Sequence, residues 1–250
     1  MTFRHQLLSQ QPLVGTLLTL PSPDVAEILA STGFDWLFLD LEHSPMNARD
    51  AQALLQAAGN VPCLVRVETR DETGIRKALD IGAQGIIVPQ VNSAEDAARI
   101  VSLARYSPQG TRGVGLARAH GYGLKFQEYV QRANDETAVV IQIEHATGVA
   151  NVDAILAVPG IDTVLIGPYD LSGSLGKLGA VNDPEVQAAI DKVLDSCRRH
   201  NITAGIFAAT AAEAQKHLDR GFSLLAVATD ALLLGRAAVE ALEALKSRAT

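Results

Sequence analysis

The sequence alternates short apolar runs with longer amphipathic segments along its whole length. Runs that are apolar almost throughout are typical of parallel strands covered by helices on both faces. Eight strands alternating with helices predict an α/β fold, a closed (β/α)8 TIM barrel. An open doubly wound sheet is the alternative, although it would use fewer strands. The predicted strands are Leu13–Leu18, Asp35–Asp40, Pro62–Val67, Gly85–Val88, Ala138–Glu144, Asp162–Ile166, Thr203–Phe207 and Ser223–Ala228.

The segments between these runs carry helix formers at helical spacing. Ser22-Pro23 and Asp183-Pro184 are typical helix starts, and several segments end in glycine just before the next strand. The 250-residue chain contains no linker or low-complexity tract, so we expect a single domain, residues 1–250. The predicted helices, besides one within Ala138–Ser172, are Asp24–Ser31, Ala48–Ala58, Glu72–Ile81, Ala94–Ala104, Pro184–Arg199, Ala211–Arg220 and Ala231–Ser247.

The composition excludes several classes of partner. The net charge is −7 and the basic residues are scattered, so the sequence predicts no nucleic-acid surface. No apolar run approaches the length of a membrane span, and none indicates a signal peptide. Cys63 and Cys197 lack the spacing of a metal site or of a disulfide framework, which fits a reducing compartment. We therefore expect a soluble, cytoplasmic protein.

The segment Ala138–Ser172 predicts a strand, a helix and a second strand, with an acidic residue after each strand. A crossover helix makes the strands parallel, so Glu144 and Asp170 leave the sheet at the same edge. Two carboxylates on rigid elements suit a hard divalent cation and leave coordination positions for substrate oxygens. The alternative role for both residues is to cap the helices that follow them.

Other polar residues fall at the same predicted rim. His43 is a candidate general base, and Asp40, three residues earlier, is a candidate to orient its ring. Arg66 interrupts an apolar strand, and a buried guanidinium there would face a carboxylate or a developing oxyanion. The alternatives are a surface histidine and a structural salt bridge.

The sequence has no candidate residues for two functions that are common in TIM barrels, Schiff-base catalysis and phosphate binding. No lysine ends a predicted strand, so a Schiff-base aldolase has no candidate nucleophile. The exits of the last two strands read FAAT and VATD, without a glycine-rich phosphate cradle. What remains favours metal-assisted enolate chemistry on a small 2-oxoacid.

Five motifs make the chain resemble one known family over nearly its whole length. They are FDWLFLDLEHSP, VRVETRDETGIRKALDIGAQGIIVPQV, TRGVG, IQIEHATGVANVDAILAVPGIDTVLIGPYDLSGSLG and VATD. Together they are similar to the HpcH/HpaI family of class II, metal-dependent pyruvate aldolases. The resemblance implies reversible aldol cleavage of 4-hydroxy-2-oxoacids to pyruvate or hydroxypyruvate plus an aldehyde, through a metal-stabilised enolate.

The resemblance also implies residue roles. Glu144 and Asp170 would hold the cation, which is Mg²⁺, Mn²⁺ or Co²⁺, and His43 would be the base. Arg66 would stabilise the transition state, and Gln142 would bind substrate. The family is hexameric, so the resemblance implies a homo-oligomer in which Asp80, at the opposite rim, reaches a neighbour's histidine. The C-terminal helix would be exchanged between subunits.

Two positions depart from the family pattern. The residue before the metal-binding aspartate is usually small and contacts the substrate carboxylate through its backbone, and here it is Tyr169. His145 stands where a small hydroxyl residue is common. Arg118 and His120 are candidates to hold a distal carboxylate of the substrate. The alternatives to an aldolase are a citramalyl- or malyl-coenzyme A lyase, a phosphate-binding isomerase and a barrel retained only for assembly.

Overall fold

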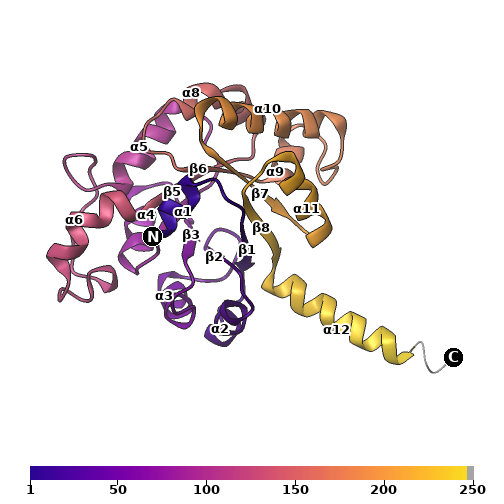
Figure 1. Ribbon diagram of the computed structural model, residues 1–250, viewed down its shortest axis with the longest axis horizontal. Helices are drawn as coiled ribbons and strands as arrows, with labels where there is room; N and C mark the ends of the chain where they lie inside the picture. Colours follow the sequence, from indigo (N-terminus) through magenta and orange to yellow (C-terminus); the bar gives the residue numbers. More distant parts are fainter. Residues whose placement is uncertain (247–250) are drawn as a thin grey trace.

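The computed structural model describes residues 1–246, which form a closed barrel of eight parallel strands in chain order (Figure 1). Every observed strand falls within two residues of its predicted bounds, and the (β/α)8 prediction is confirmed. The last strand pairs with the first, so the sheet has no open edge. The strands are β1 (Leu13–Leu18), β2 (Trp36–Asp40), β3 (Cys63–Arg66), β4 (Gly85–Val88), β5 (Ala138–Ile143), β6 (Thr163–Ile166), β7 (Thr203–Ala208) and β8 (Leu224–Thr229).

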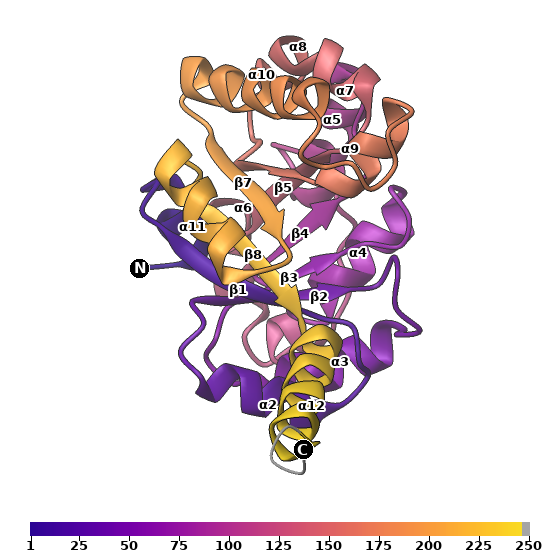
Figure 2. The same cartoon turned by 90° about the vertical axis from the view of Figure 1, so that its right-hand side faces the viewer.

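The helices surround the barrel (Figures 1 and 2). Ser22 and Asp183 cap two of them at the predicted Pro positions, through side chains that accept backbone N–H groups. The helices are α1 (Phe3–Leu8), α2 (Pro23–Ser31), α3 (Ala48–Ala57), α4 (Glu72–Asp80), α5 (Ala94–Ala104), α6 (Phe126–Glu136), α7 (Ala146–Ala150), α8 (Val152–Leu156), α9 (Pro168–Ser174), α10 (Pro184–His200), α11 (Ala211–Arg220) and α12 (Asp230–Lys246), with a 3₁₀ turn, η1 (Arg118–His120).

The core lies in two layers. A larger cluster fills the space between strands and helices, and a smaller one fills the barrel interior. Trp36 and Phe38 stack inside the barrel, with ring centroids 6.0 Å apart. Phe3 and Leu7 of α1 belong to this inner cluster, so α1 closes the N-terminal end of the barrel and leaves only the opposite end open.

Three helices were not predicted from the sequence. Helix α1 has six residues and buries only Phe3 and Leu7. Helix α6 fully buries Ala133, and Phe126, Tyr129 and Val130 on the same face are half-buried. Helix α9 begins at Pro168, directly after β6, and places Asp170 in a first helical turn. Proline suits such a turn because the N–H that it lacks would have no intrahelical partner.

Helix α12 leaves the barrel after β8 and projects away from it (Figures 1 and 2). Its Leu234, Val239 and Leu242 side chains are 64%, 55% and 52% exposed. The predicted end of this helix, Ser247, lies outside the described residues. No helix among residues 1–246 combines the length and apolar character needed to span a membrane.

Candidate active site

The pair Asp40–Arg66 joins the C-terminal ends of β2 and β3. Nε of Arg66 donates to Oδ1 of Asp40 at 2.9 Å, and Nη2 donates to Oδ2 at 2.7 Å. Both side chains are buried, and the guanidinium lies 5.2 Å from the centre of the Phe38 ring. Burial alone raises the pKa of Asp40, but the hydrogen bond and charge of Arg66 outweigh it, so the pKa lies below its ordinary value. Arg66 is thereby fixed at the barrel mouth as a cation.

The turn after β2 carries His43. Asp40 accepts hydrogen bonds from the backbone N–H groups of Glu42, at 3.0 Å, and His43, at 3.3 Å. Nε2 of His43 lies 3.7 Å from Oε2 of Glu42, and the imidazole is 64% exposed. The carboxylate beside the ring therefore belongs to Glu42, whereas Asp40 fixes the backbone of the turn.

Glu42 was not among the residues singled out from the sequence. Its Oε2 lies 3.2 Å from Nη1 of Arg66, which joins the guanidinium and the histidine turn. Burial raises the pKa of Glu42, and the charges of Arg66 and His43 oppose that effect without cancelling it. Its position two residues after a strand-end aspartate was the available signal.

Glu144 follows β5 and is buried. Its Oε1 accepts the backbone N–H of Gln90 at 2.9 Å, and its Oε2 accepts Nε2 of Gln142. Gln90 has a φ of 55°, a left-handed conformation that turns its N–H toward the carboxylate. Burial raises the pKa of Glu144 to about 7, and the charges of Glu42 and Asp170 act in the same direction.

This set of residues fits a divalent cation. Oε1 of Gln142 is buried and has no hydrogen-bond partner among residues 1–246, so the site holds an acceptor that is left for a cation or a substrate group. A Cβ at position 167 would lie 2.7 Å from Oε2 of Glu144, and glycine there lets the end of β6 approach the carboxylate. Among residues 1–246, no group of three or more His, Cys, Asp or Glu is arranged to hold a metal ion. A cation here would complete its shell with water or substrate oxygens.

A pocket of about 160 Å³ opens at the centre of this end of the barrel. We call it the catalytic pocket. It brings together five residues that the sequence singled out: His43, Arg66, Gln142, Tyr169 and Asp170. Leu17, Phe38, Leu165 and Phe207 give it apolar walls.

Asp80 lies at the other end of the barrel, as predicted. It ends α4, and its Oδ1 accepts Nη2 of Arg112 at 2.9 Å. The Arg112 guanidinium is buried and lies 4.5 Å from the centre of the Tyr106 ring. The expected contact with a neighbour's histidine requires a second copy of the chain, and it stays a prediction.

Arg118 and His120 also lie away from the catalytic pocket. The connection that holds them packs against the end of α4, where Nη1 of Arg118 donates to the carbonyl of Ile81 at 2.8 Å. His120 is buried, and its Nε2 lies 3.2 Å from the hydroxyl of Tyr106. Neither side chain holds a distal carboxylate in the catalytic pocket of its own barrel.

The comparisons with known proteins agree with this geometry. The profile of the family described as HpcH/HpaI aldolase/citrate lyase matches residues 14–237. A "Hydroxypyruvate/pyruvate aldolase" of Paraburkholderia phytofirmans is 40% identical, over 98% of this chain and 97% of that protein. A "4-hydroxy-2-oxo-heptane-1,7-dioate aldolase" of Escherichia coli is 41% identical, over 97% of this chain and 94% of that protein. The crystal structure of an HpcH/HpaI family protein from Burkholderia cenocepacia superposes with a TM-score of 0.94, at 37% identity and 98% coverage of both chains. The chain belongs to the HpcH/HpaI aldolase/citrate lyase family.

Proposed function

We propose that the protein catalyses the reversible aldol cleavage of 4-hydroxy-2-oxoacids to pyruvate or hydroxypyruvate plus an aldehyde. The names of the relatives support this carbon–carbon lyase activity. The observation that carries it is the convergence of a buried Arg66, an exposed His43 and acidic residues around one pocket. The same residues are the ones that an enolate intermediate requires.

In the cleavage direction, the C4 hydroxyl of the substrate loses its proton and the C3–C4 bond breaks. The electron pair of that bond moves to C3, C2 and the 2-oxo oxygen, which gives the enolate, and C4 leaves as the aldehyde carbonyl. The enolate then takes a proton at C3 and becomes the 2-oxoacid product. His43 lines the pocket with an exposed ring, and we assign it the transfer of the C4 proton, directly or through water.

Arg66 supplies a positioned positive charge. Its guanidinium is fixed by Asp40 and still faces the pocket, so it stabilises the oxygen that becomes negative in the enolate. Gln142 and the backbone of Tyr169 hold the substrate carboxylate and 2-oxo group. A divalent cation, Mg²⁺, Mn²⁺ or Co²⁺, held by Glu144 and Asp170, would supply Lewis-acid polarisation of the 2-oxo group.

We also propose a homo-oligomer, a hexamer by family resemblance, with α12 exchanged between subunits. The exposed apolar side chains of α12 support this, because an isolated helix of 17 residues gains most of its stability by packing. We expect the enzyme to work in the cytoplasm, and its free, buried cysteines Cys63 and Cys197 fit that compartment.

The experiment is a pyruvate-release assay on a panel of 4-hydroxy-2-oxoacids, with and without a chelator. We expect cleavage to stop in excess chelator and to return with Mg²⁺, Mn²⁺ or Co²⁺. Borohydride should trap no substrate adduct. Full activity in excess chelator would overturn the role of the cation, and a trapped adduct would show that the protein uses a Schiff base instead.

A further inference from the structure

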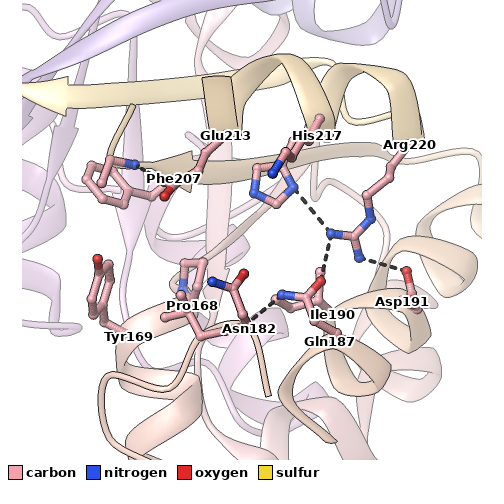
Figure 3. Close-up of a pocket in the computed structure, with 13 residues that line it drawn as sticks. Pro168, Tyr169, Asn182, Gln187, Ile190, Asp191, Phe207, Glu213, His217 and Arg220 are labelled. Atoms are coloured by element: carbon pink, nitrogen blue, oxygen red, sulfur yellow. Dashed lines mark hydrogen bonds and ion pairs between the residues drawn. The ribbon is translucent and has the colours of Figure 1, made fainter. Parts of the chain in front are cut away.

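A second, larger pocket lies beside the catalytic pocket, between α10 and α11 (Figure 3). We call it the outer pocket, and its volume is about 430 Å³. Its polar wall comes from the loop before α10, from α10 itself and from one side of α11. Asn182, Gln187, Glu213, His217 and Arg220 supply the side chains of that wall.

The outer pocket and the catalytic pocket share three lining residues: Pro168, Tyr169 and Phe207. The two cavities therefore adjoin each other at these side chains. Figure 3 shows the rings of Tyr169 and Phe207 at one end of the outer pocket, opposite Arg220 and Asp191. The Tyr169 side chain is 47% exposed, and its hydroxyl makes no hydrogen bond within residues 1–246. This ring lines both cavities and stands where they adjoin.

The catalytic pocket is smaller than most ligand sites and opens to solvent. Ligand sites usually enclose about 300–1,000 Å³, and this pocket encloses about 160 Å³. A three-carbon 2-oxoacid fits that space, whereas the aldehyde half of a longer substrate must extend beyond it. The outer pocket begins at the residues that border the catalytic pocket, so it offers the adjoining space.

The charges of the outer pocket are balanced. Arg220 lies 2.8 Å from Oδ1 of Asp191 and donates to Oε1 of Gln187 at 2.9 Å. Glu213 accepts the backbone N–H of Ala209 at 2.9 Å. A distal carboxylate of a substrate would have to compete with Asp191 for this arginine. Lys216, the other basic residue that lines the pocket, is exposed to solvent, so the pocket lacks a free buried cation for an anionic aldehyde.

The remaining polar groups suit hydroxyl groups. The Asn182 amide both donates and accepts hydrogen bonds, as does a neutral imidazole. Burial and the charges of Arg220 and Lys216 lower the pKa of His217 to about 4, so its ring is neutral near pH 7. Nδ1 of His217 lies 3.4 Å from Nη1 of Arg220, which leaves Nε2 for another partner.

We propose that the outer pocket is the subsite for the aldehyde half and that it selects uncharged, polyhydroxylated aldehydes. Tyr169 and Phe207 form the passage from the reacting carbon to this subsite, and Asn182 and His217 bind the hydroxyl groups. This inference rests on the proposed aldolase function. In the synthetic direction, C3 of the enolate bonds to the aldehyde carbon, and the aldehyde oxygen takes up a proton.

The test compares aldehydes in the addition reaction with pyruvate, using the full-length chain and added Mn²⁺. Glycolaldehyde is the short probe, erythrose the polyhydroxylated probe and succinic semialdehyde the anionic probe. We expect the double variant Asn182→Leu/His217→Leu to lower kcat/KM for erythrose about tenfold while changing that for glycolaldehyde less than twofold. Gln215→Leu is the matched control, because Gln215 lies on α11 outside the outer pocket, and it should change neither value.

Exchange of the pyruvate methyl protons with deuterated water separates the two proposals, since it needs the enolate but no aldehyde. Absence of exchange in the parent protein would overturn the aldolase function itself. Normal exchange with equal losses for glycolaldehyde and erythrose in the double variant would overturn the outer subsite. A parent protein that prefers succinic semialdehyde to erythrose would overturn the selection of uncharged aldehydes. Erythritol, an unreactive polyol, should inhibit competitively against erythrose and not against pyruvate.

Discussion

At the scale of single residues, the Asp40–Arg66 pair determines how the catalytic pocket is charged. Two parallel hydrogen bonds hold a guanidinium between two strand ends. Such a buried pair costs desolvation energy for both groups, and it persists when geometry and further hydrogen bonds compensate. Here Asp40 also accepts two backbone N–H groups of the His43 turn. A single carboxylate thus positions both the proposed base and the proposed oxyanion donor.

Replacing Arg66 with lysine should lower the turnover rate without changing the binding of the cation. The lysine ammonium group keeps the positive charge but lacks the planar guanidinium. It therefore cannot donate hydrogen bonds to Asp40 and to the reacting oxygen at the same time. We expect kcat to fall about 100-fold or more, as for the loss of one oxyanion donor. Calorimetry with Mn²⁺ should show unchanged cation binding. Arg76→Lys, on the exposed face of α4, is the control and should be nearly normal. Near-parental turnover in Arg66→Lys would remove Arg66 from the mechanism.

His217 should make stability depend on pH. Burial lowers its folded-state pKa to about 4, whereas an unfolded histidine titrates near 6.5. As the pH falls from about 6.5 to about 4, the unfolded chain takes up this proton first, so the free energy of unfolding decreases. Arg220 and Lys216 lower the pKa with burial, and Glu213 opposes them. Thermal unfolding should show a smaller loss of Tm between pH 7 and pH 5 in His217→Gln than in the parent. Equal losses would show that His217 is accessible to protons in the folded state.

The sequence predicted which residues meet at the site better than how they contact one another. His43, Arg66, Gln142 and Asp170 fall at strand ends, and topology alone brings strand ends together. The sequence did not determine which acidic residue pairs with Arg66, because Asp40 and Glu42 are both within reach of its guanidinium. Gln90 went unnoticed, since its contact with Glu144 uses a backbone N–H that every residue except proline carries.

At the scale of secondary structure, the bounds of strands and long helices were predictable and those of short helices were not. Helix α9 has seven residues, and its glycine and two serines resemble a loop. Its first turn is defined by Pro168 and by packing of Leu171 in the core rather than by helix propensity. Helix α6, in contrast, carries Phe126, Tyr129, Val130 and Ala133 at helical spacing, so its existence was predictable from the sequence.

The cap of α3 should stabilise the turn that carries His43. Oδ1 of Asn47 accepts the N–H groups of Arg49 and Asp50, and the Asp50 carboxylate in turn accepts the Asn47 N–H. We expect Asn47→Ala to lower stability by about 1 kcal/mol, which corresponds to roughly 2–4 °C in Tm for a chain of this size. Asn47→Ser should keep most of that stability. An unchanged Tm in Asn47→Ala would show that water replaces the cap.

The exposed face of α12 should drive assembly. A charge at Leu242, which is 52% exposed in the single chain, would be buried in an exchanged helix and therefore costly. We expect Leu242→Glu to shift the sedimentation profile from the oligomer toward the 26.4 kDa chain. Glu243→Gln, on the same helix, should keep the parental profile. A parental oligomer in Leu242→Glu would place the contact on another face.

At the scale of the whole molecule, we predict that Asp80 connects assembly to catalysis. It lies at the N-terminal rim, so it can act on a histidine only across an interface. We expect Asp80→Asn to lower activity and to shift the pH profile, because removing a negative neighbour lowers the pKa of a histidine. The inactive His43→Ala protein and the Asp80→Asn protein can be dissociated and reassembled together. The reassembled mixture should have more activity than the two proteins measured separately.

The amide that Asp80→Asn introduces can still accept a hydrogen bond from Arg112, so the variant tests charge more than folding. Its Tm should therefore stay close to the parental value. Kinetics identical to those of the parent, at every pH and without gain on mixing, would show that each barrel works alone.

The pairing of β1 with β8 sets the order of events during synthesis of the chain. Leu13 pairs with Leu224, so the two strands that close the barrel are among the first and the last to be translated. The barrel cannot close before β8, the eighth strand in the chain, has left the ribosome. Domains fold as units once their residues are available. A nascent chain therefore exposes seven unclosed strands until β8 has been synthesised, and chaperones have that interval in which to prevent its open edges from pairing with other chains.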